Sequence, residues 1–403
     1  MYLKNNFYKY KIDACLILYF YKNRESAIYK IIVFQKNMDN SLKYKIALSL
    51  IPNIGDIRAK KLVAYCGSVE GVFEEKKSSL EKIPGIGSSV ASDVLNHNIF
   101  DRAEEEILFI KKNNITPIFY LDNNYPKRLT HCEDSPILLY YKGNANLNAE
   151  KTISIVGTRE ATDYGKSICE KLIADLAIHN VTIVSGLAYG IDICAHRAAL
   201  ENNLPTVCAL AHGLDKIYPA VHKATAEKML ENGAWLSDFT SKTIPDRENF
   251  PRRNRIVAGI SDATIVVESK KGGGSLITAN IANSYNRDVF AFPGKVDDVC
   301  SEGCNNLIKQ NKAVLIQSAA DIVYILGWEE SKISKNPIQK KLFIELKADE
   351  ELLVNVLKEK NSITIDELCY AVNMPMGKVS SLLLTLEFSG IVKSLPGKMY
   401  RLN

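Results

Sequence analysis

Three arginines crowd into the segment FPRRNRIVAG at residues 250–259, at positions Arg252, Arg253 and Arg255. A guanidinium presents its N–H groups in a fixed fork, which suits two-point contacts with a phosphate or a carboxylate. An apolar run follows the arginines, so the charge stands at the start of a segment that is typical of a buried element. A solvated helix face is the plain alternative for such a run of charge.

Segments rich in glycine and hydroxyl side chains follow several apolar runs that are typical of buried strands. These segments are GTREATDYG at 157–165, SGLAYGID at 185–192, AHG at 211–213 and KKGGGSLIT at 270–278. Backbone N–H groups at the start of a helix after such a loop bind anions readily, and Ser185, Ser275 and Thr278 add hydroxyl donors. Because charge and glycine coincide in these segments, we expect an anion-binding rim rather than a solvated face.

Familiar active-site patterns are missing from these segments. The glycines do not follow G-x-G-x-x-G, and GGGSLIT lacks the lysine that a Walker A loop places before its serine. Cys300 and Cys304 form the only close pair among nine cysteines, without a second Cys or His pair nearby, which disfavours zinc. We therefore expect no metal, no cofactor and no catalytic triad. We interpret His196 as a structural histidine and leave the role of His212 open.

Residues 151–317 alternate between short β-branched runs and helix-length segments. We predict strands at 152–157, 181–186, 205–210, 234–239, 263–269, 288–294 and 313–317, with helices at 163–179 and 190–202. Strands separated by helices of about 10–15 residues imply right-handed crossovers and an α/β fold with a doubly wound, mostly parallel, Rossmann-like sheet. Ligands of such sheets bind at the carboxyl ends of the strands, where the glycine-rich segments fall. We expect this domain to span residues 148–327.

Two similar segments precede the sheet, IPNIGDIRAKKLVAYCGS at 51–68 and IPGIGSSVASDVLN at 83–96. Each repeats an apolar residue, Pro, one residue and Ile-Gly before a helix, which is the helix-hairpin-helix (SAM-like) pattern. Gly55 and Gly87 allow a tight turn whose N–H groups can face a phosphate. A compact packing module is the other interpretation, because the second copy has no basic residue nearby. We expect residues 38–147 to hold this helical module and a connecting segment with an apolar hairpin.

The C-terminal part begins with a linker at 328–341. Residues 342–403 then show apolar positions at helical spacing, followed by two short segments around Pro396 and Gly397. Three helices and a β wing make a winged helix. Its third helix carries Lys378 and Glu387 but no arginine, so we favour partner docking or an auxiliary role over the reading of duplex DNA.

The net charge of +5 comes entirely from residues 1–37, which hold seven Lys/Arg and two Asp/Glu. The neutral remainder disfavours a protein that coats nucleic acid through general positive charge. The same segment makes a poor signal peptide, so we interpret it as a non-native or disordered extension before a domain that opens at Met38. An N-terminal peptide of the native protein that begins before Met38 would contradict this. Scattered cysteines and the lack of a long apolar run favour a cytoplasmic location without a membrane span.

The segments GTREATDYG, SGLAYGIDICAH, GLDKIYP, FPRRNRIVAG and GGGSLITA, in this order and spacing, resemble the DprA (Smf) family of DNA-processing proteins. The likeness is strong over residues 150–320 and looser in the flanking modules. It implies an extended Rossmann fold that binds and protects single-stranded DNA. It also implies loading of the RecA recombinase onto that DNA in natural transformation and homologous recombination, a homodimer through the Rossmann domain, and no chemical step.

By position in the matched motifs, the resemblance implies DNA contacts from Gly157, Arg159, Ser185, Gly186, Phe250, Arg253, Asn254, Arg255, Gly274, Ser275 and Thr278. Arg252 falls at a variable position of the FP-x-RNR motif. Phe250 and Tyr189 are candidate platforms for base stacking, and core packing is the alternative for both. Because the motifs hold few arginines, few phosphates would be contacted. We therefore expect a slope of log affinity against log salt concentration of roughly −2 to −4, and little sequence preference. Residues that contact RecA are not assigned.

Two rival functions stay open on the sequence alone. Nucleotide phosphoribohydrolases place a similar sheet behind a P-G-G-x-G-T-x-x-E loop, whereas here GGGSLITAN has Glu268 before it and no glutamate after it. The other rival is a scaffold that binds a partner protein and senses a small nucleotide. Release of free base from a nucleoside monophosphate would support the enzyme, and tight binding of a mononucleotide would support the scaffold.

Overall fold

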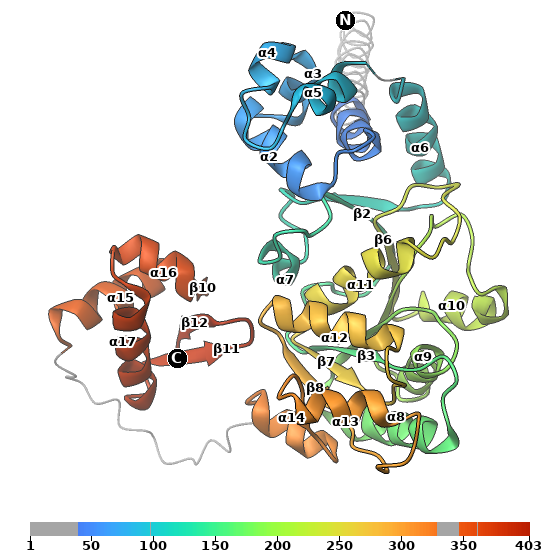
Figure 1. The fold of residues 1–403 in the computed structure, drawn as a ribbon, viewed down its shortest axis with the longest axis vertical. Helices are drawn as coiled ribbons and strands as arrows, with labels where there is room; N and C mark the ends of the chain where they lie inside the picture. The colour runs from blue at the N-terminus through green and yellow to red at the C-terminus, as the bar shows by residue number, and fades with distance from the viewer. Residues whose placement is uncertain (1–38, 97, 329–345, 361) are drawn as a thin grey trace, which may run out of the picture. The chain divides into compact units, whose positions relative to one another are not determined.

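The computed structural model describes residues 39–96, 98–328, 346–360 and 362–403 (Figure 1). The extension expected at 1–37 and nearly all of the linker expected at 328–341 lie outside the described residues. The chain divides into two compact units, one ending at Ile115 and one beginning at Thr116.

The N-terminal unit is helical. Residues 39–50 form its first helix, followed by α2 (Asp56–Cys66), α3 (Val69–Glu74), α4 (Lys77–Leu80), α5 (Ser88–Leu95) and α6 (Phe100–Lys112). Gly55 precedes α2 and Gly87 precedes α5, both with extended backbone. Each of these turns joins two helices, as the helix-hairpin-helix pattern predicts. Leu62, Leu80 and Val94 are fully buried in the core of this unit.

A nine-stranded sheet forms the centre of the second unit, in the order β1-β2-β6-β5-β4-β3-β7-β8-β9. The strands are β1 (Thr116–Phe119), β2 (Leu138–Gly143), β3 (Thr152–Val156), β4 (Thr182–Ser185), β5 (Thr206–Ala209), β6 (Ala234–Ser237), β7 (Ala263–Val266), β8 (Asp288–Ala291) and β9 (Val314–Leu315). All pairs among β3 to β9 are parallel, whereas β1 and β2 pair antiparallel with each other and β2 with β6. Each of the seven segments predicted as strands contains one of β3 to β9, so the doubly wound sheet is confirmed.

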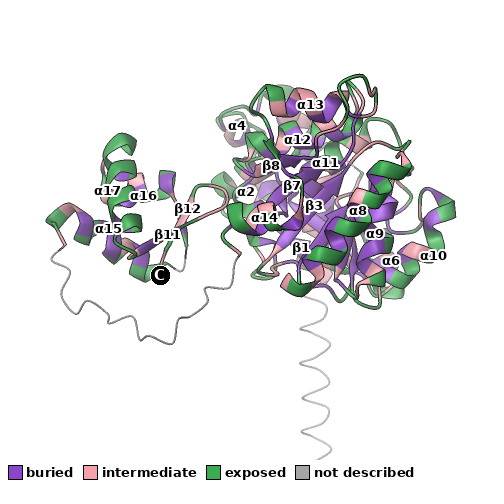
Figure 2. Cartoon of the chain, turned by 90° about the horizontal axis from the view of Figure 1, so that it is seen from below, coloured by how far each residue is buried: buried purple, intermediate pink, exposed green. Residues whose placement is uncertain are grey.

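Helices cover both faces of this sheet (Figure 1). They are α7 (Lys127–Thr130), α8 (Asp163–Leu176), η1 (Ala177–His179), α9 (Ile191–Glu201), η2 (Ala220–His222), α10 (Lys223–Met229), α11 (Asn249–Gly259), α12 (Gly274–Ser284), α13 (Glu302–Lys309) and α14 (Ala319–Ile325). Strands β3 to β7 are buried throughout, whereas both residues of the edge strand β9 are exposed, and the helices expose their outer faces (Figure 2).

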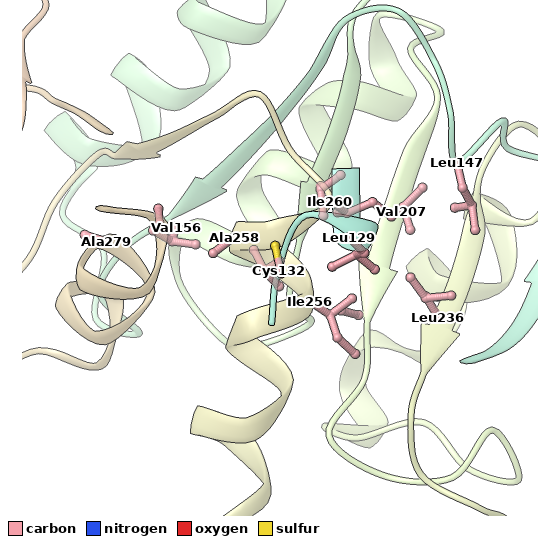
Figure 3. Packing of buried hydrophobic residues seen from close by; sticks show 14 of the residues in the cluster. Leu129, Cys132, Leu147, Val156, Val207, Leu236, Ile256, Ala258, Ile260 and Ala279 are labelled. Carbon is pink, nitrogen blue, oxygen red and sulfur yellow. The ribbon is translucent and has the colours of Figure 1, made fainter. Parts of the chain in front are cut away.

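Alternate side chains of the strands enter two separate cores. Val156 of β3 packs with Ile256 of α11 and Ala279 of α12 in one cluster (Figure 3). Its neighbour Ile155 packs with Cys169 of α8 in the other. Each fully buried aliphatic side chain contributes about 1.5–3 kcal/mol, which fixes the strand ends that carry the site.

The C-terminal domain contains α15 (Ala348–Glu359), β10 (Ile363–Thr364), α16 (Ile365–Val372), α17 (Met376–Phe388), β11 (Val392–Leu395) and β12 (Met399–Leu402). Its three strands pair in the order β10-β12-β11, and Leu353, Leu368 and Leu383 form its core. Three helices with this small sheet confirm the predicted winged helix.

Candidate functional site

The carboxyl ends of the parallel strands gather the glycine-rich segments at one edge of the sheet. The loops after β3, β4, β5 and β7 begin at Gly157, Gly186, Leu210 and Val267. Because these four strands are neighbours and parallel, their last residues share this edge. The order of the strands in the sheet therefore places Arg159, Tyr189 and His212 in adjacent loops.

Arg159 and Phe250 form a stacked pair at this edge. The guanidinium carbon of Arg159 lies 5.2 Å from the centre of the Phe250 ring. Arg159 is exposed and Phe250, in the first turn of α11, is half-buried. Such a cation–π pair contributes about 0.5–1 kcal/mol where it is exposed, so a ligand can displace it at little cost.

The stacked pair lines a small pocket with a volume of about 40 Å³. Three aromatic rings, Tyr189, Tyr218 and Phe250, contribute to its wall, and its polar lining residues besides these are Arg159, His212 and Arg253. Tyr189 and Tyr218 are each about half exposed. The pocket therefore offers apolar ring faces beside positive charge.

Arg253 is buried below the rim. Its Nη1 donates to the carbonyl of Ala209 at 2.5 Å, and its side chain also contacts the pocket. Burial raises the pKa of the nearby Asp192 carboxyl, and the positive charge of Arg253 opposes that rise. Asp192 Oδ2 accepts from the N–H of Ala188 at 3.3 Å. These two hydrogen bonds hold Arg253 of α11 on the end of β5 and Asp192 of α9 on the loop after β4.

Arg255 is also buried, but it contacts different residues from Arg253. Its Nη2 lies 2.6 Å from Asp238 Oδ2, and its Nη1 donates to the carbonyl of Asp134. Arg252 is the exposed member of the arginine cluster, 3.4 Å from Asp238 and 5.0 Å from the Phe239 ring centre. The interpretation of the cluster as a solvated face is therefore wrong for two of the three arginines, because carboxylates and carbonyls hold them inside.

The glycine-rich loop after β7 presents backbone rather than hydroxyl groups. Gly272 has a positive φ of 74°, and α12 starts after Gly273, which has no side chain to cap the first N–H groups. Ser275 is buried and donates to Ser269 Oγ at 2.9 Å, and Thr278 is also buried. The first N–H groups of α12, uncapped by any side chain, are thus the donors that this loop offers to an anion.

An ion pair joins this loop to the loop after β3. Lys270 Nζ pairs with the carboxylate of Glu160, and this contact raises the pKa of Lys270 and lowers that of Glu160. Both side chains are substantially exposed. The pair places a carboxylate on an edge that otherwise favours anions.

The structure brings together some of the residues predicted for DNA contact and separates others. Arg159, Phe250 and Arg253 line the pocket. Behind it, Ser185 donates to the carbonyl of Ile155 at 2.6 Å, and Gly186 accepts from His196. The remaining predicted residues, Gly157, Asn254, Arg255, Gly274, Ser275 and Thr278, do not line it.

His196 is structural, as predicted. It is fully buried, with its ring nitrogens bonded to Thr206 Oγ1 and to the carbonyl of Gly186. Sequence reasoning missed the pairing of Asp192 with Arg253 and of Asp238 with Arg255. The available signals were Asp192 in the glycine-rich segment after the predicted strand 181–186 and Asp238 near the end of the predicted strand 234–239, both at the edge that receives the arginines.

Glu268 lies in the loop after β7, and both of its carboxylate oxygens accept hydrogen bonds from Thr162. Its two oxygens accept from the N–H of Thr162 at 2.9 Å and from Thr162 Oγ1 at 2.6 Å, which fixes the start of α8. Over the described ranges, no group of three His, Cys, Asp or Glu side chains is arranged to hold a metal ion. Within the same ranges, no helix has the length and apolar character to cross a membrane.

Comparison with known proteins gives the family. The model of the family DNA recombination-mediator protein A matches residues 116–327, and that of the DprA winged helix domain matches residues 344–398. The chain therefore belongs to the DNA recombination-mediator protein A family, also called DprA or Smf, and the resemblance seen in the sequence is confirmed.

Relatives and a solved structure agree with this assignment. Protein Smf of Synechocystis sp. is 32% identical over 394 residues, which cover 89% of this chain and 98% of that protein. The DNA processing protein DprA of Streptococcus pneumoniae is 40% identical over 203 residues, which cover 50% of this chain and 71% of that protein. The X-ray structure of DprA from Streptococcus pneumoniae superposes with a TM-score of 0.61 at 32% identity, over 70% of this chain and 97% of that one.

Proposed function

We propose that this protein binds single-stranded DNA at the pocket edge of its parallel sheet. The observation that carries the proposal is the Arg159–Phe250 stack on a pocket lined by aromatic rings. Membership of the DprA family supports the wider role. In that role the protein protects incoming single strands and loads RecA onto them in natural transformation and homologous recombination, without a chemical step.

The site suits a single strand better than a duplex. Aromatic platforms bind bases by stacking, and a duplex hides its base faces inside. Tyr189, Tyr218 and Phe250 supply ring faces, while Arg159 and the uncapped start of α12 supply contacts for phosphate. A pocket of about 40 Å³ holds only a few water molecules, so Arg159 and Phe250 must separate before a base can enter.

The described carboxylates near the glycine-rich loop are held by other groups, and the exposed one, Glu160, pairs with Lys270. A phosphoribohydrolase needs a carboxylate available beside the glycine-rich loop, whereas Thr162 occupies both oxygens of Glu268. Asp192 is the other buried carboxylate at this edge, and it faces Arg253. Binding without chemistry therefore fits the arrangement better than hydrolysis.

Fluorescence anisotropy tests the proposal. Full-length protein is titrated against a labelled strand of about 30 nucleotides, longer than the roughly 4–16 that one binding fold covers, and against its duplex, at several salt concentrations. We expect the single strand to bind first, with a log–log salt slope of roughly −2 to −4.

The variant Arg159→Ala locates the binding. It should cost about 1–3 kcal/mol of binding free energy, as loss of a charge-assisted contact does. Arg197→Ala is the matched control, because Arg197 is an exposed arginine of α9 that does not line the pocket. Equal binding of strand and duplex, or equal behaviour of the two variants, would overturn the proposal.

RecA loading and the homodimer rest on the family resemblance and need their own tests. Light scattering of the purified protein measures its mass in solution, and a mass of one chain would contradict the dimer. For RecA loading, we expect the protein to speed filament assembly on a strand already coated with a single-strand-binding protein. Arg159→Ala should lose that effect together with strand affinity.

A further inference from the structure

Within the described part of the chain, two nitrogen atoms of the pocket residues have no hydrogen-bond partner. They are Nε2 of His212 and Nε of Arg253, and both are shielded from solvent. The side chain of His212 is 1% exposed and that of Arg253 is 5% exposed. Buried polar atoms are nearly always paired, so an unpaired atom in each of two residues lining one pocket points to a ligand.

The hydrogen bonding of His212 defines what its unpaired atom offers. Nδ1 lies 2.9 Å from the carbonyl oxygen of Gly213, and a carbonyl only accepts, so Nδ1 carries the hydrogen. Burial lowers the pKa of His212, and the charge of Arg253 lowers it further, against the opposing charge of Asp215. The ring is therefore neutral near pH 7, and Nε2 is a bare acceptor.

Arg253 supplies the complementary atom. Its guanidinium is planar and its Nη1 is fixed on the carbonyl of Ala209, so the direction of its Nε–H is also fixed. Arg253 and His212 line the same pocket. The residues lining the pocket thus include one unpaired hydrogen-bond acceptor, on His212, and one unpaired donor, on Arg253.

We propose that His212 and Arg253 read the polar edge of the base that enters the pocket. His212 Nε2 accepts from an N–H of the base, and Arg253 Nε donates to a neighbouring acceptor. Every DNA base has such a pair of atoms: N3–H with O4 in thymine, N1–H with O6 in guanine, and an amino group beside a ring nitrogen in adenine and cytosine. The pocket therefore accepts all four bases and rejects a group of the same shape without a polar edge.

This inference rests on the proposed single-strand binding and deepens it. It gives a physical reason for low sequence preference, because the feature that is read is common to all bases. Stacking on Phe250 alone would also tolerate every base, but it would equally tolerate an apolar ring. The two explanations therefore differ in what they predict for an apolar analogue of a base.

A double-substitution experiment tests the proposal. Short strands carry one base at a fixed position among abasic sites, either thymine or difluorotoluene, which has the shape of thymine without its polar edge. Full-length wild type should bind the thymine strand about tenfold more tightly, the loss expected when buried polar groups stay unpaired. His212→Phe should lose about the same factor for thymine and nothing more for the analogue, because the two changes remove the same contact.

His179→Phe is the control, since His179 belongs to η1 and does not line the pocket. Its affinity should equal that of wild type, and a thermal melt of each variant reports folding. Equal wild-type affinity for the thymine and difluorotoluene strands overturns the proposal, whatever the His212 variant does. The proposal is also overturned if the loss from His212→Phe and the loss from difluorotoluene add up when the two changes are combined. Either of these results leaves the proposed function standing if Arg159→Ala still weakens binding, whereas failure of wild type to bind any strand removes both.

Discussion

Arg253 packs directly against Gly186. A Cβ atom at Gly186 would stand 2.1 Å from Arg253 Nη1 and 2.5 Å from Asp192 Oδ2. The backbone φ of Gly186 is not in the left-handed region, so this position requires glycine for close approach rather than for conformation. The second glycine-rich loop thus makes room for a buried arginine.

Gly186→Ala should therefore destabilise the Rossmann domain. The guanidinium of Arg253 is the end of a flexible side chain, but Ala209 and Asp192 hold it in place, so it has little room to shift. We expect a loss of about 1–3 kcal/mol in the free energy of unfolding, measured by urea denaturation. Gly274→Ala is the stability control, because a Cβ atom there meets no described atom within 4 Å. Equal stability of Gly186→Ala and wild type would show that Arg253 is free to move.

Arg255→Ala should unfold the protein more easily, whereas Arg159→Ala should not. Removal of Arg255 leaves Asp238, whose side chain is 2% exposed, with a weaker contact to Arg252 at 3.4 Å. Loss of one partner of a buried ion pair costs about 3–5 kcal/mol, and the remaining contact reduces this cost. Arg159 is exposed and loses only its stack on Phe250, so its removal should cost no more than about 1 kcal/mol.

Urea denaturation of Arg255→Ala and Arg159→Ala shows whether a loss of DNA binding comes from a lost DNA contact or from a less stable fold. If Arg255→Ala binds a single strand weakly and is also less stable, its binding defect reflects the fold rather than a lost phosphate contact. If Arg255→Ala is as stable as wild type but binds weakly, Arg255 contacts DNA directly and must leave Asp238 to do so. Arg197→Ala again serves as the reference for loss of an exposed arginine.

The sequence predicted the sheet and the edge that carries the site, because both depend on local pattern. The β-branched run at 152–157 and the glycines after it determine a buried strand and a loop whatever packs around them. The burial of Arg253 and Arg255 depends instead on contacts between distant segments. Asp192 lies 61 residues before Arg253 in the sequence, and charge in a segment does not show which way it faces.

The antiparallel edge of the sheet was harder to predict for the same reason. The sequence predicted a short strand, a turn and an apolar hairpin between 101 and 147. β1 and β2 lie in this segment and pair antiparallel, but α7 lies between them in the chain, so they do not form a tight hairpin. Nothing in their own residues shows that Tyr140 of β2 will lie opposite Ser237 of β6. That register is set by packing of the whole sheet.

Glu160→Gln should increase affinity for single-stranded DNA. The carboxylate of Glu160 pairs with Lys270 at the anion-binding edge, and both side chains are exposed, so the pair contributes little to stability. Its removal releases Lys270 for a phosphate and removes a repelling charge. We expect about two- to fivefold tighter binding at low salt and a steeper salt slope, with the difference fading at high salt. Glu201→Gln, at the far end of α9, should change neither the affinity nor the salt slope. If that variant also binds more tightly, the effect of Glu160→Gln comes from the change in net charge rather than from the release of Lys270.

His196 should make the protein less stable in acid. Burial lowers its pKa from 6.5 in the unfolded chain to about 4 in the folded protein. Between these values the unfolded chain binds a proton that the folded protein excludes, so the free energy of unfolding falls as the pH falls from about 6.5 to 4 and is least affected above 6.5. The loss from this one group reaches about 3 kcal/mol at the acid end.

Urea denaturation between about pH 4.5 and 7.5 measures the effect, with His196→Gln for comparison. The glutamine does not titrate, so its stability should depend less steeply on pH, whatever its stability at neutral pH. His179→Gln, which alters a histidine that is not fully buried, should keep the wild-type slope. An equal slope in wild type and His196→Gln would show that another group controls the acid response.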